Sequence, residues 1–132
     1  MYTIVAGIDD DEARATAQAR TILDMPTAAD EFEVVLAHSF VENASGASIA
    51  QVASVTRAED MLEAAGVDVI LEESGNNDPA DAVIEIAERR GADLVVVAGR
   101  KRSPTKKAVF GSVSQKIMLN TDRPVLVCGA AE

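Results

Sequence analysis

A strongly basic segment between two glycines is the part of the sequence best suited to chemistry. It runs from Gly99 to Ser112 and holds five of the 12 lysine and arginine residues of a chain whose formal net charge is -10. A glycine followed by the start of a helix presents backbone N–H groups without partners, and such groups bind phosphate. The segment therefore predicts a site for an anion, with a phosphate-bearing small molecule as the leading ligand. Its basic residues are Arg100, Lys101, Arg102, Lys106 and Lys107.

Other readings of this segment remain open. A solvated loop, or a surface that docks an acidic partner, would explain the same positive charges. A turn glycine at Gly99 and a helix-capping serine at Ser112 would explain the remaining residues. If the segment does bind phosphate, the backbone N–H groups of Gly111, Ser112 and Val113 are the expected donors, together with the Ser112 hydroxyl.

Two carboxylates follow the first apolar run of the chain. Asp9 and Asp10 are placed to hold a ribose hydroxyl or a Mg²⁺ ion, or to cap the helix that comes next. His38 is the only histidine and ends another apolar run, so we expect a structural histidine more than a general base. No catalytic residue and no metal site are predicted, and an enzymatic role would be at most a slow ATPase.

The familiar nucleotide motifs are missing from the sequence. There is no Walker A pattern, in which four residues separate two glycines and Lys and Ser or Thr follow the second. There is also no Gly-x-Gly-x-x-Gly after the first apolar run, which argues against a dinucleotide site. Any phosphate site in this chain must therefore be of another type.

Composition restricts the class of protein. The chain has 132 residues, of which 48% are apolar and only 3% aromatic, so we expect a single domain over 1–132 with an aliphatic core. The acidic surface argues against nucleic-acid and membrane partners. It suits a salt-rich cytoplasm, although an ordinary acidic surface is an equal explanation. We expect a cytoplasmic protein, with the lone cysteine, Cys128, buried and inert.

Apolar runs alternate with helical spacing along the whole chain. Strands are expected at 2–8, 32–38, 67–71, 94–97 and 124–128, and polar loops at 41–48 and 72–77. Helices are expected at 11–23, 55–65, 79–90 and 112–120, the last with Val113 and Ile117 on its inner face. This alternation predicts a parallel sheet with helices on both faces. Ligands bind such sheets at the carboxyl ends of the strands, where Asp9, Ser39 and Gly99 would lie.

With these segments in place, the whole chain resembles a universal stress protein. The resemblance rests on Ile4-Val-Ala-Gly-Ile-Asp9, Leu94-Val-Val-Val-Ala-Gly99, Phe110-Gly-Ser-Val113 and Asp122-Arg-Pro-Val-Leu-Val127. It implies a three-layer α/β/α fold with a five-stranded parallel sheet in the order 3-2-1-4-5. It also implies a homodimer formed through the last strand, Val125 to Cys128, which fits an apolar edge strand.

The resemblance also implies an ATP site. ATP-binding members carry Gly, two residues, Gly, nine residues, and then Gly followed by Ser or Thr. Gly99 and Gly111-Ser112 match the ends of this pattern, but Arg102 stands at the second glycine and the loop is one residue shorter. By analogy, Asp9 would lie near the ribose, Gly7 and Ser39 near the adenine, and Gly99, Gly111, Ser112 and Val113 at the phosphates. Arg102 either blocks this approach or adds a bidentate phosphate contact.

Two functions follow from this reading. The first is a cytoplasmic stress-response protein that binds ATP or a related nucleotide, with or without Mg²⁺, as a regulatory ligand at the Gly99–Ser112 loop. The alternative is a nucleotide-free dimer whose basic loop docks an acidic partner. The partner, the stress and the nucleotide are not specified by the sequence.

Overall fold

A computed structural model describes residues 1–39, 48–76, 78–99 and 111–129 of the chain. Strands and α-helices alternate along them, with two short 3-10 turns at Ala29–Glu31 and Ile49–Gln51. The strands are β1 (Tyr2–Gly7), β2 (Phe32–Ser39), β3 (Asp68–Ser74), β4 (Leu94–Ala98) and β5 (Val125–Cys128). The α-helices are α1 (Glu12–Leu23), α2 (Ala53–Ala64), α3 (Pro79–Arg90) and α4 (Ser112–Asn120).

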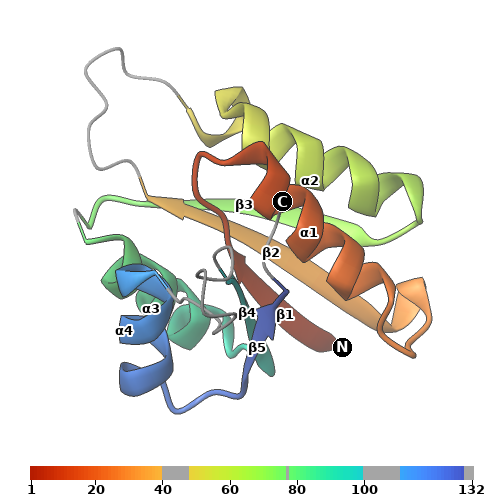
Figure 1. Ribbon diagram of the computed structural model, residues 1–132. Helices are drawn as coiled ribbons and strands as arrows, with labels where there is room; N and C mark the ends of the chain where they lie inside the picture. Colours follow the sequence, from red (N-terminus) through yellow and green to blue (C-terminus); the bar gives the residue numbers. More distant parts are fainter. Residues whose placement is uncertain (40–47, 77, 100–110, 130–132) are drawn as a thin grey trace, which may run out of the picture.

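The five strands form one parallel sheet in the order β3-β2-β1-β4-β5. Helices α1 and α2 cover one face of this sheet, and α3 and α4 cover the other (Figure 1). The predicted fold class, with its three layers and its strand order, is confirmed. Chain order reverses at β1, because β2 lies on one side of it and β4 on the other.

The core is divided between the two faces of the sheet. Along β1, Ile4 and Ala6 point to the layer of α1 and α2, whereas Val5 points to the layer of α3 and α4. Successive side chains of a strand point to opposite faces, so a strand covered on both sides must be apolar at every position. All three side chains are completely buried, which explains the continuous apolar run.

Local sequence signals set the helix boundaries. Asp11 is the N-cap of α1 and accepts a hydrogen bond from the backbone N–H of Arg14. Asp78 caps α3 in the same way, with Pro79 as the first helical residue. Helix α3 ends at Gly91, whose φ of 62° lies in the left-handed region that favours glycine. These boundaries agree with the sequence to within a residue or two.

Two details differ from the prediction. Residues 72–74, expected in a loop, extend β3, where Glu72 pairs with Ala37 of β2. The side chain of Glu72 is held by Arg89 at 2.8 Å and by Arg90 at 3.2 Å, so this edge position accommodates a carboxylate. Val113 does not pack in the core, because its side chain is 38% exposed. The expected loop at 41–48 lies, except for Ser48, outside the described residues.

Within the described part of the chain, no helix is both long enough and apolar enough to cross a membrane.

Candidate functional site

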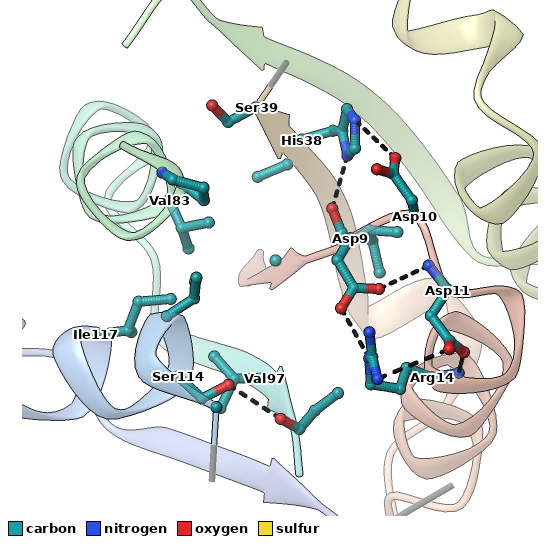
Figure 2. A pocket seen from close by; sticks show the side chains of 17 residues that line it. Asp9, Asp10, Asp11, Arg14, His38, Ser39, Val83, Val97, Ser114 and Ile117 are labelled. Carbon is teal, nitrogen blue, oxygen red and sulfur yellow. Dashed lines mark hydrogen bonds and ion pairs between the residues drawn. The ribbon is translucent and has the colours of Figure 1, made fainter. Parts of the chain in front are cut away.

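A cavity of about 320 Å³ lies at the carboxyl edge of the sheet, where β1 and β4 separate and chain order reverses (Figure 2). In parallel sheets this is the place where ligands bind. The cavity has an apolar side and a polar side. The apolar side includes Ala37 of β2, Val97 of β4, Pro79 and Val83 of α3, and Val113 and Ile117 of α4. The polar lining residues are Asp9, Asp10, Asp11, Arg14, His38, Ser39 and Ser114, of which Ser114 lies beside Val97.

Gly7 brings the apolar wall close to β1. A Cβ atom at this position would lie 3.0 Å from Cγ2 of Val83, which is too close for an ordinary contact. The missing side chain therefore lets α3 pack directly on the end of β1. The sequence reading placed the Gly7 backbone beside the ligand, and Gly7 does line the cavity.

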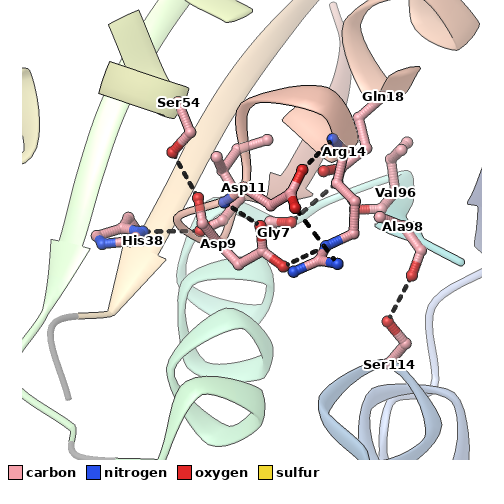
Figure 3. Close-up of polar contacts among 11 residues, drawn as sticks. Gly7, Asp9, Asp11, Arg14, Gln18, His38, Ser54, Val96, Ala98 and Ser114 are labelled. Atoms are coloured by element: carbon pink, nitrogen blue, oxygen red, sulfur yellow. Dashed lines mark hydrogen bonds and ion pairs between the residues drawn. The ribbon is translucent and has the colours of Figure 1, made fainter. Parts of the chain in front are cut away.

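The carboxylate of Asp9 is held in place from two directions (Figure 3). Its Oδ1 accepts a hydrogen bond of 2.9 Å from the backbone N–H of Asp11. Its Oδ2 accepts one of 2.8 Å from Nε of Arg14, which also lies 3.7 Å, through Nη1, from Oδ2 of Asp11. Asp11, not Asp9, caps α1. Asp9 is thus left at the cavity with a fixed orientation.

His38 lies almost fully buried at the end of β2, with 4% of its surface exposed. Its Nδ1 is 2.7 Å from the carbonyl oxygen of Ile8. A carbonyl oxygen can only accept, so Nδ1 carries a proton and donates it to this bond. Nε2 faces the carboxylate of Asp10 at 3.6 Å. These contacts fit the structural role that we expected for the histidine.

Gln18 joins β1 to β4 below the point where the strands separate. The ladder between the two strands reaches Ala6 and Val96. The side-chain amide of Gln18 donates to the carbonyl oxygen of Gly7 at 2.9 Å and to that of Val96 at 3.3 Å (Figure 3). The two carbonyl oxygens at the fork, that of Val96 buried and that of Gly7 half-buried, thereby receive a donor. The Oε1 atom of the same amide is buried without a hydrogen-bond partner among the described residues.

Helix α4 begins at the rim of the cavity. Gly111 is its N-cap and supplies no side-chain bond to the first turn. The first N–H groups of a helix have no partner within it, so this turn is available to an anion. Ser114, also in the first turn, donates its hydroxyl to the carbonyl oxygen of Ala98 at 2.9 Å. The beginning of α4 is therefore attached to the end of β4.

An ion-pair cluster links α4 to α3 beside the cavity. Nζ of Lys116 lies 2.9 Å from Asp78, the N-cap of α3, and 3.3 Å from Asp81. The hydrogen bond from Lys116, assisted by the backbone N–H groups of Asp81 and Ala80, lowers the pKa of Asp78. The hydrogen bonds that Lys116 donates to Asp78 and Asp81 raise its own pKa. The charge of Lys116 is therefore paired with carboxylates at the start of α3.

The structure brings together five of the residues predicted for the site. These cavity-lining residues are Gly7, Asp9, Ser39, Gly111 and Val113. Ser112 is exposed at the first position of α4 and is not part of the lining. Gly99 is buried at the end of β4, where its backbone N–H donates to Cys128 at 3.1 Å. Arg100, Lys101 and Arg102 lie outside the described residues.

Sequence reasoning missed Arg14, Ser114, Val83 and Pro79 as lining residues. Arg14 and Ser114 are each three residues beyond the N-cap of their helix. The first turns of α1 and α4 both meet the carboxyl edge of the sheet, so this position was the available signal. Cys128 is buried as expected, and burial raises the pKa of its thiol.

Residues 1–129 match the universal stress protein family, so the chain belongs to that family. Over 50 residues it is 46% identical to the stress response protein NhaX of Bacillus subtilis. That match covers 38% of this chain and spans 30% of the length of NhaX.

Solved structures share the fold over nearly the whole chain. A universal stress protein from Archaeoglobus fulgidus superposes with a TM-score of 0.75 at 23% identity, covering 97% of this chain and 98% of that one. A universal stress protein in complex with cAMP superposes with a TM-score of 0.71 at 24% identity, and the match covers 98% of each chain. A universal stress protein family protein from Arabidopsis thaliana with AMP bound superposes with a TM-score of 0.69 at 17% identity. That match covers 98% of this chain and 92% of the Arabidopsis chain. At these identities the likeness establishes the fold alone.

Proposed function

We propose that this protein binds an adenine nucleotide in the cavity at the carboxyl edge of the sheet, as a regulatory ligand in a stress response. The observation that carries the proposal is the position of the cavity, between the separating ends of β1 and β4 and the first turn of α4. The cavity of about 320 Å³ falls within the usual range for small-molecule sites. Similarly folded family members contain cAMP and AMP.

The two sides of the cavity suit the two ends of a nucleotide. The apolar wall formed by Val83, Ile117 and Val97 offers a surface for a base. The oriented carboxylate of Asp9 can accept hydrogen bonds from ribose hydroxyls, since each of its oxygens has further acceptor capacity. The first turn of α4, from Gly111 to Ser114, would hold phosphate.

Several finer expectations belong to this proposal. ATP is the nucleotide implied by the resemblance, and Mg²⁺ would accompany its phosphates. A homodimer through β5 is supported by the place of this strand at the edge of the sheet. The cytoplasmic location stays a prediction, and adaptation to high salt stays a prediction from the acidic composition. The contribution of Arg100, Lys101 and Arg102 to phosphate binding stays a prediction as well.

Thermal unfolding of the nucleotide-stripped protein tests the proposal. At about 100 times its dissociation constant, a ligand adds roughly 2.7 kcal/mol to the free energy of unfolding. For a domain of this size, the midpoint would rise by several degrees. We expect this rise with AMP or Mg-ATP and not with inorganic phosphate, each at the same ionic strength. No rise at millimolar nucleotide would reject the proposal and favour the nucleotide-free docking module.

A matched pair of variants locates the phosphates. Val113 is 38% exposed in the first turn of α4, so polar residues fit there. Val113→Asp places a negative charge where phosphate would lie, whereas Val113→Asn has nearly the same shape without the charge. The Asp variant should lose the thermal shift with AMP, and the Asn variant should keep most of it. Equal shifts in both would place the phosphates elsewhere.

A further inference from the structure

We infer that Arg14 is the residue by which this cavity distinguishes phosphorylated nucleotides from nucleosides. The inference rests on the proposed nucleotide site and adds a specificity-determining contact from α1. It does not depend on the basic segment at 100–110. Three observations carry it: the place of Arg14 over the end of β4, the way its guanidinium is held, and the charge of the groups around it.

The placement follows from Gln18. The amide of Gln18 reaches the carbonyl oxygen of Val96, so this face of α1 lies over β4. Arg14 is one turn earlier on the same face, because residues four apart in a helix lie one above the other. Four helical residues advance about 6 Å along α1, and two strand residues advance about 6.6 Å. Since α1 runs back along the sheet, Arg14 lies near the level of Ala98, at the edge that the cavity opens on (Figure 3).

The guanidinium is oriented before any ligand arrives. Asp9 accepts from Nε at 2.8 Å, and Asp11 lies 3.7 Å from Nη1. A guanidinium has five N–H donors, so these two carboxylates leave donors for a ligand. The side chain of Arg14 is 24% exposed and lines the cavity. An arginine fixed in this way loses little conformational freedom on binding and suits a bidentate contact to phosphate.

The charges around the cavity make this contact necessary. Three carboxylates line it, those of Asp9, Asp10 and Asp11, and they repel a phosphate. Among the described lining residues, Arg14 is the one side chain that is always positively charged. The first turn of α4 lies on the opposite face of the sheet, where Ser114 bonds to Ala98. A phosphate placed at the sheet edge beside Ala98 would therefore contact the first turn of α4 on one face of the sheet and Arg14 on the other.

Titration calorimetry with AMP and with adenosine tests the inference, using the full chain at one fixed potassium chloride concentration. Arg14→Gln should weaken AMP binding about ten- to hundredfold, the loss expected for a hydrogen bond to a charged group. The same substitution should leave adenosine binding within about twofold, because adenosine lacks the phosphate and the backbone N–H of Asp11 still orients the Asp9 carboxylate. Arg14→Lys keeps the charge without the planar fork, so it should recover part of the AMP affinity.

Arg20→Gln is the matched control. It removes the same charge from an exposed position of the same helix and should change neither affinity. The inference is overturned if Arg14→Gln weakens AMP and adenosine equally, or if Arg20→Gln weakens AMP as much as Arg14→Gln does. Wild-type binding of AMP that Arg14→Gln leaves unchanged rejects the role of Arg14 but keeps the nucleotide site. Absence of wild-type binding to both AMP and adenosine rejects the nucleotide site itself, and the inference with it.

Discussion

The hydroxyl of Ser114 donates a hydrogen bond to the carbonyl oxygen of Ala98 at 2.9 Å. These two residues lie on either side of the basic segment at 100–110, the part of the sequence that first suggested an anion site. The bond attaches the first turn of α4 to the last residue of β4, whatever the residues between them do. The two ends of the expected phosphate loop are thus held together by atoms outside the loop.

Ser114→Ala should loosen this attachment. A net loss of about 1 kcal/mol in the free energy of unfolding is expected for one hydrogen bond. Nucleotide affinity should fall as well, because the first turn of α4 is less well fixed. Urea unfolding and AMP titration measure the two effects. Thr27→Ala is the control, since it removes a hydroxyl from an exposed residue that does not line the cavity; an equal loss in both variants would contradict this account.

Gln18→Met should destabilise the protein more strongly. Methionine has a similar length but donates nothing, so the carbonyl oxygens of Gly7 and Val96 lose the bonds that Gln18 supplies. One unsatisfied buried acceptor costs about 1–3 kcal/mol. Removal of the unpaired Oε1 offsets part of this cost. The midpoint of thermal unfolding should fall clearly for Gln18→Met and hardly at all for the exposed control Gln115→Met. Equal midpoints for the two variants would mean that the fork between β1 and β4 needs no donor.

Because of the ion pair between Asp78 and Lys116, the free energy of unfolding should fall as the pH is lowered into the acid range. The pKa of Asp78 is lowered in the folded protein, so its stabilising effect is present above the unfolded value of about 3.9. The effect is lost as the pH falls through the lower, folded pKa. Asp78→Asn retains a good N-cap and removes the charge.

The variant should therefore unfold at a lower temperature than wild type at pH 7, and the difference should disappear in strong acid. Midpoints measured from pH 7 to pH 2 check this. The control is Asp30→Asn, the same chemical change at an exposed site. A constant difference between Asp78→Asn and wild type at every pH would show that the charge of Asp78 contributes nothing.

Glu59→Gln should stabilise the protein at low salt. Burial raises the pKa of Glu59, and the neighbouring charges of Glu63 and Asp60 raise it further. A raised pKa means that the ionised carboxylate costs stability at neutral pH, and that this cost is relieved as the pH falls through the folded pKa. A like-charge pair four residues apart on a helix costs about 0.2–0.5 kcal/mol.

We therefore expect a small rise in the unfolding midpoint of Glu59→Gln at 0.05 M potassium chloride. The repulsive part should vanish near 1 M salt, where the screening length is about 3 Å. The wild-type protein measured at the same salt concentrations is the reference. A fall in the midpoint at low salt would mean that the Glu59 carboxylate makes a favourable contact.

The sheet was predictable because its signals are local and redundant. The alternation of apolar runs and helices, the cap at Asp78 and the stop at Gly91 each point to the same fold. Residues 72–74 were misassigned because an edge strand bears polar side chains where a neighbouring helix supplies partners, here Arg89 and Arg90. Such partners are distant in sequence, so no local pattern reveals them.

The site was predictable only in outline. Gly7, Asp9 and Ser39 lie at or just beyond the carboxyl ends of strands, so they could be placed at one edge of the sheet. The roles of Arg14 and Gln18 depend on which face of α1 lies over β4, and this is set by the packing of the helix. The cap of α1 proved to be Asp11 and not Asp9, a difference of two residues that leaves Asp9 for the cavity. Sequence spacing alone cannot tell which of these two carboxylates caps the helix and which lines the cavity.

The polar side chains around the cavity use main-chain carbonyl oxygens as hydrogen-bond acceptors. Side chains from α1, β2, α2 and α4 each donate to a backbone carbonyl at the carboxyl ends of β1 and β4 or just beyond β1. These hydrogen bonds therefore do not depend on the side chains of the residues that accept them, and among those residues only Gly7 shapes the cavity through its lack of a side chain. At the accepting residues other than Gly7, evolution can exchange the side chains, and with them the preferred ligand, while these hydrogen bonds are kept. The donor–acceptor pairs are Gln18 with Gly7 and Val96, His38 with Ile8, Ser54 with Asp9, and Ser114 with Ala98.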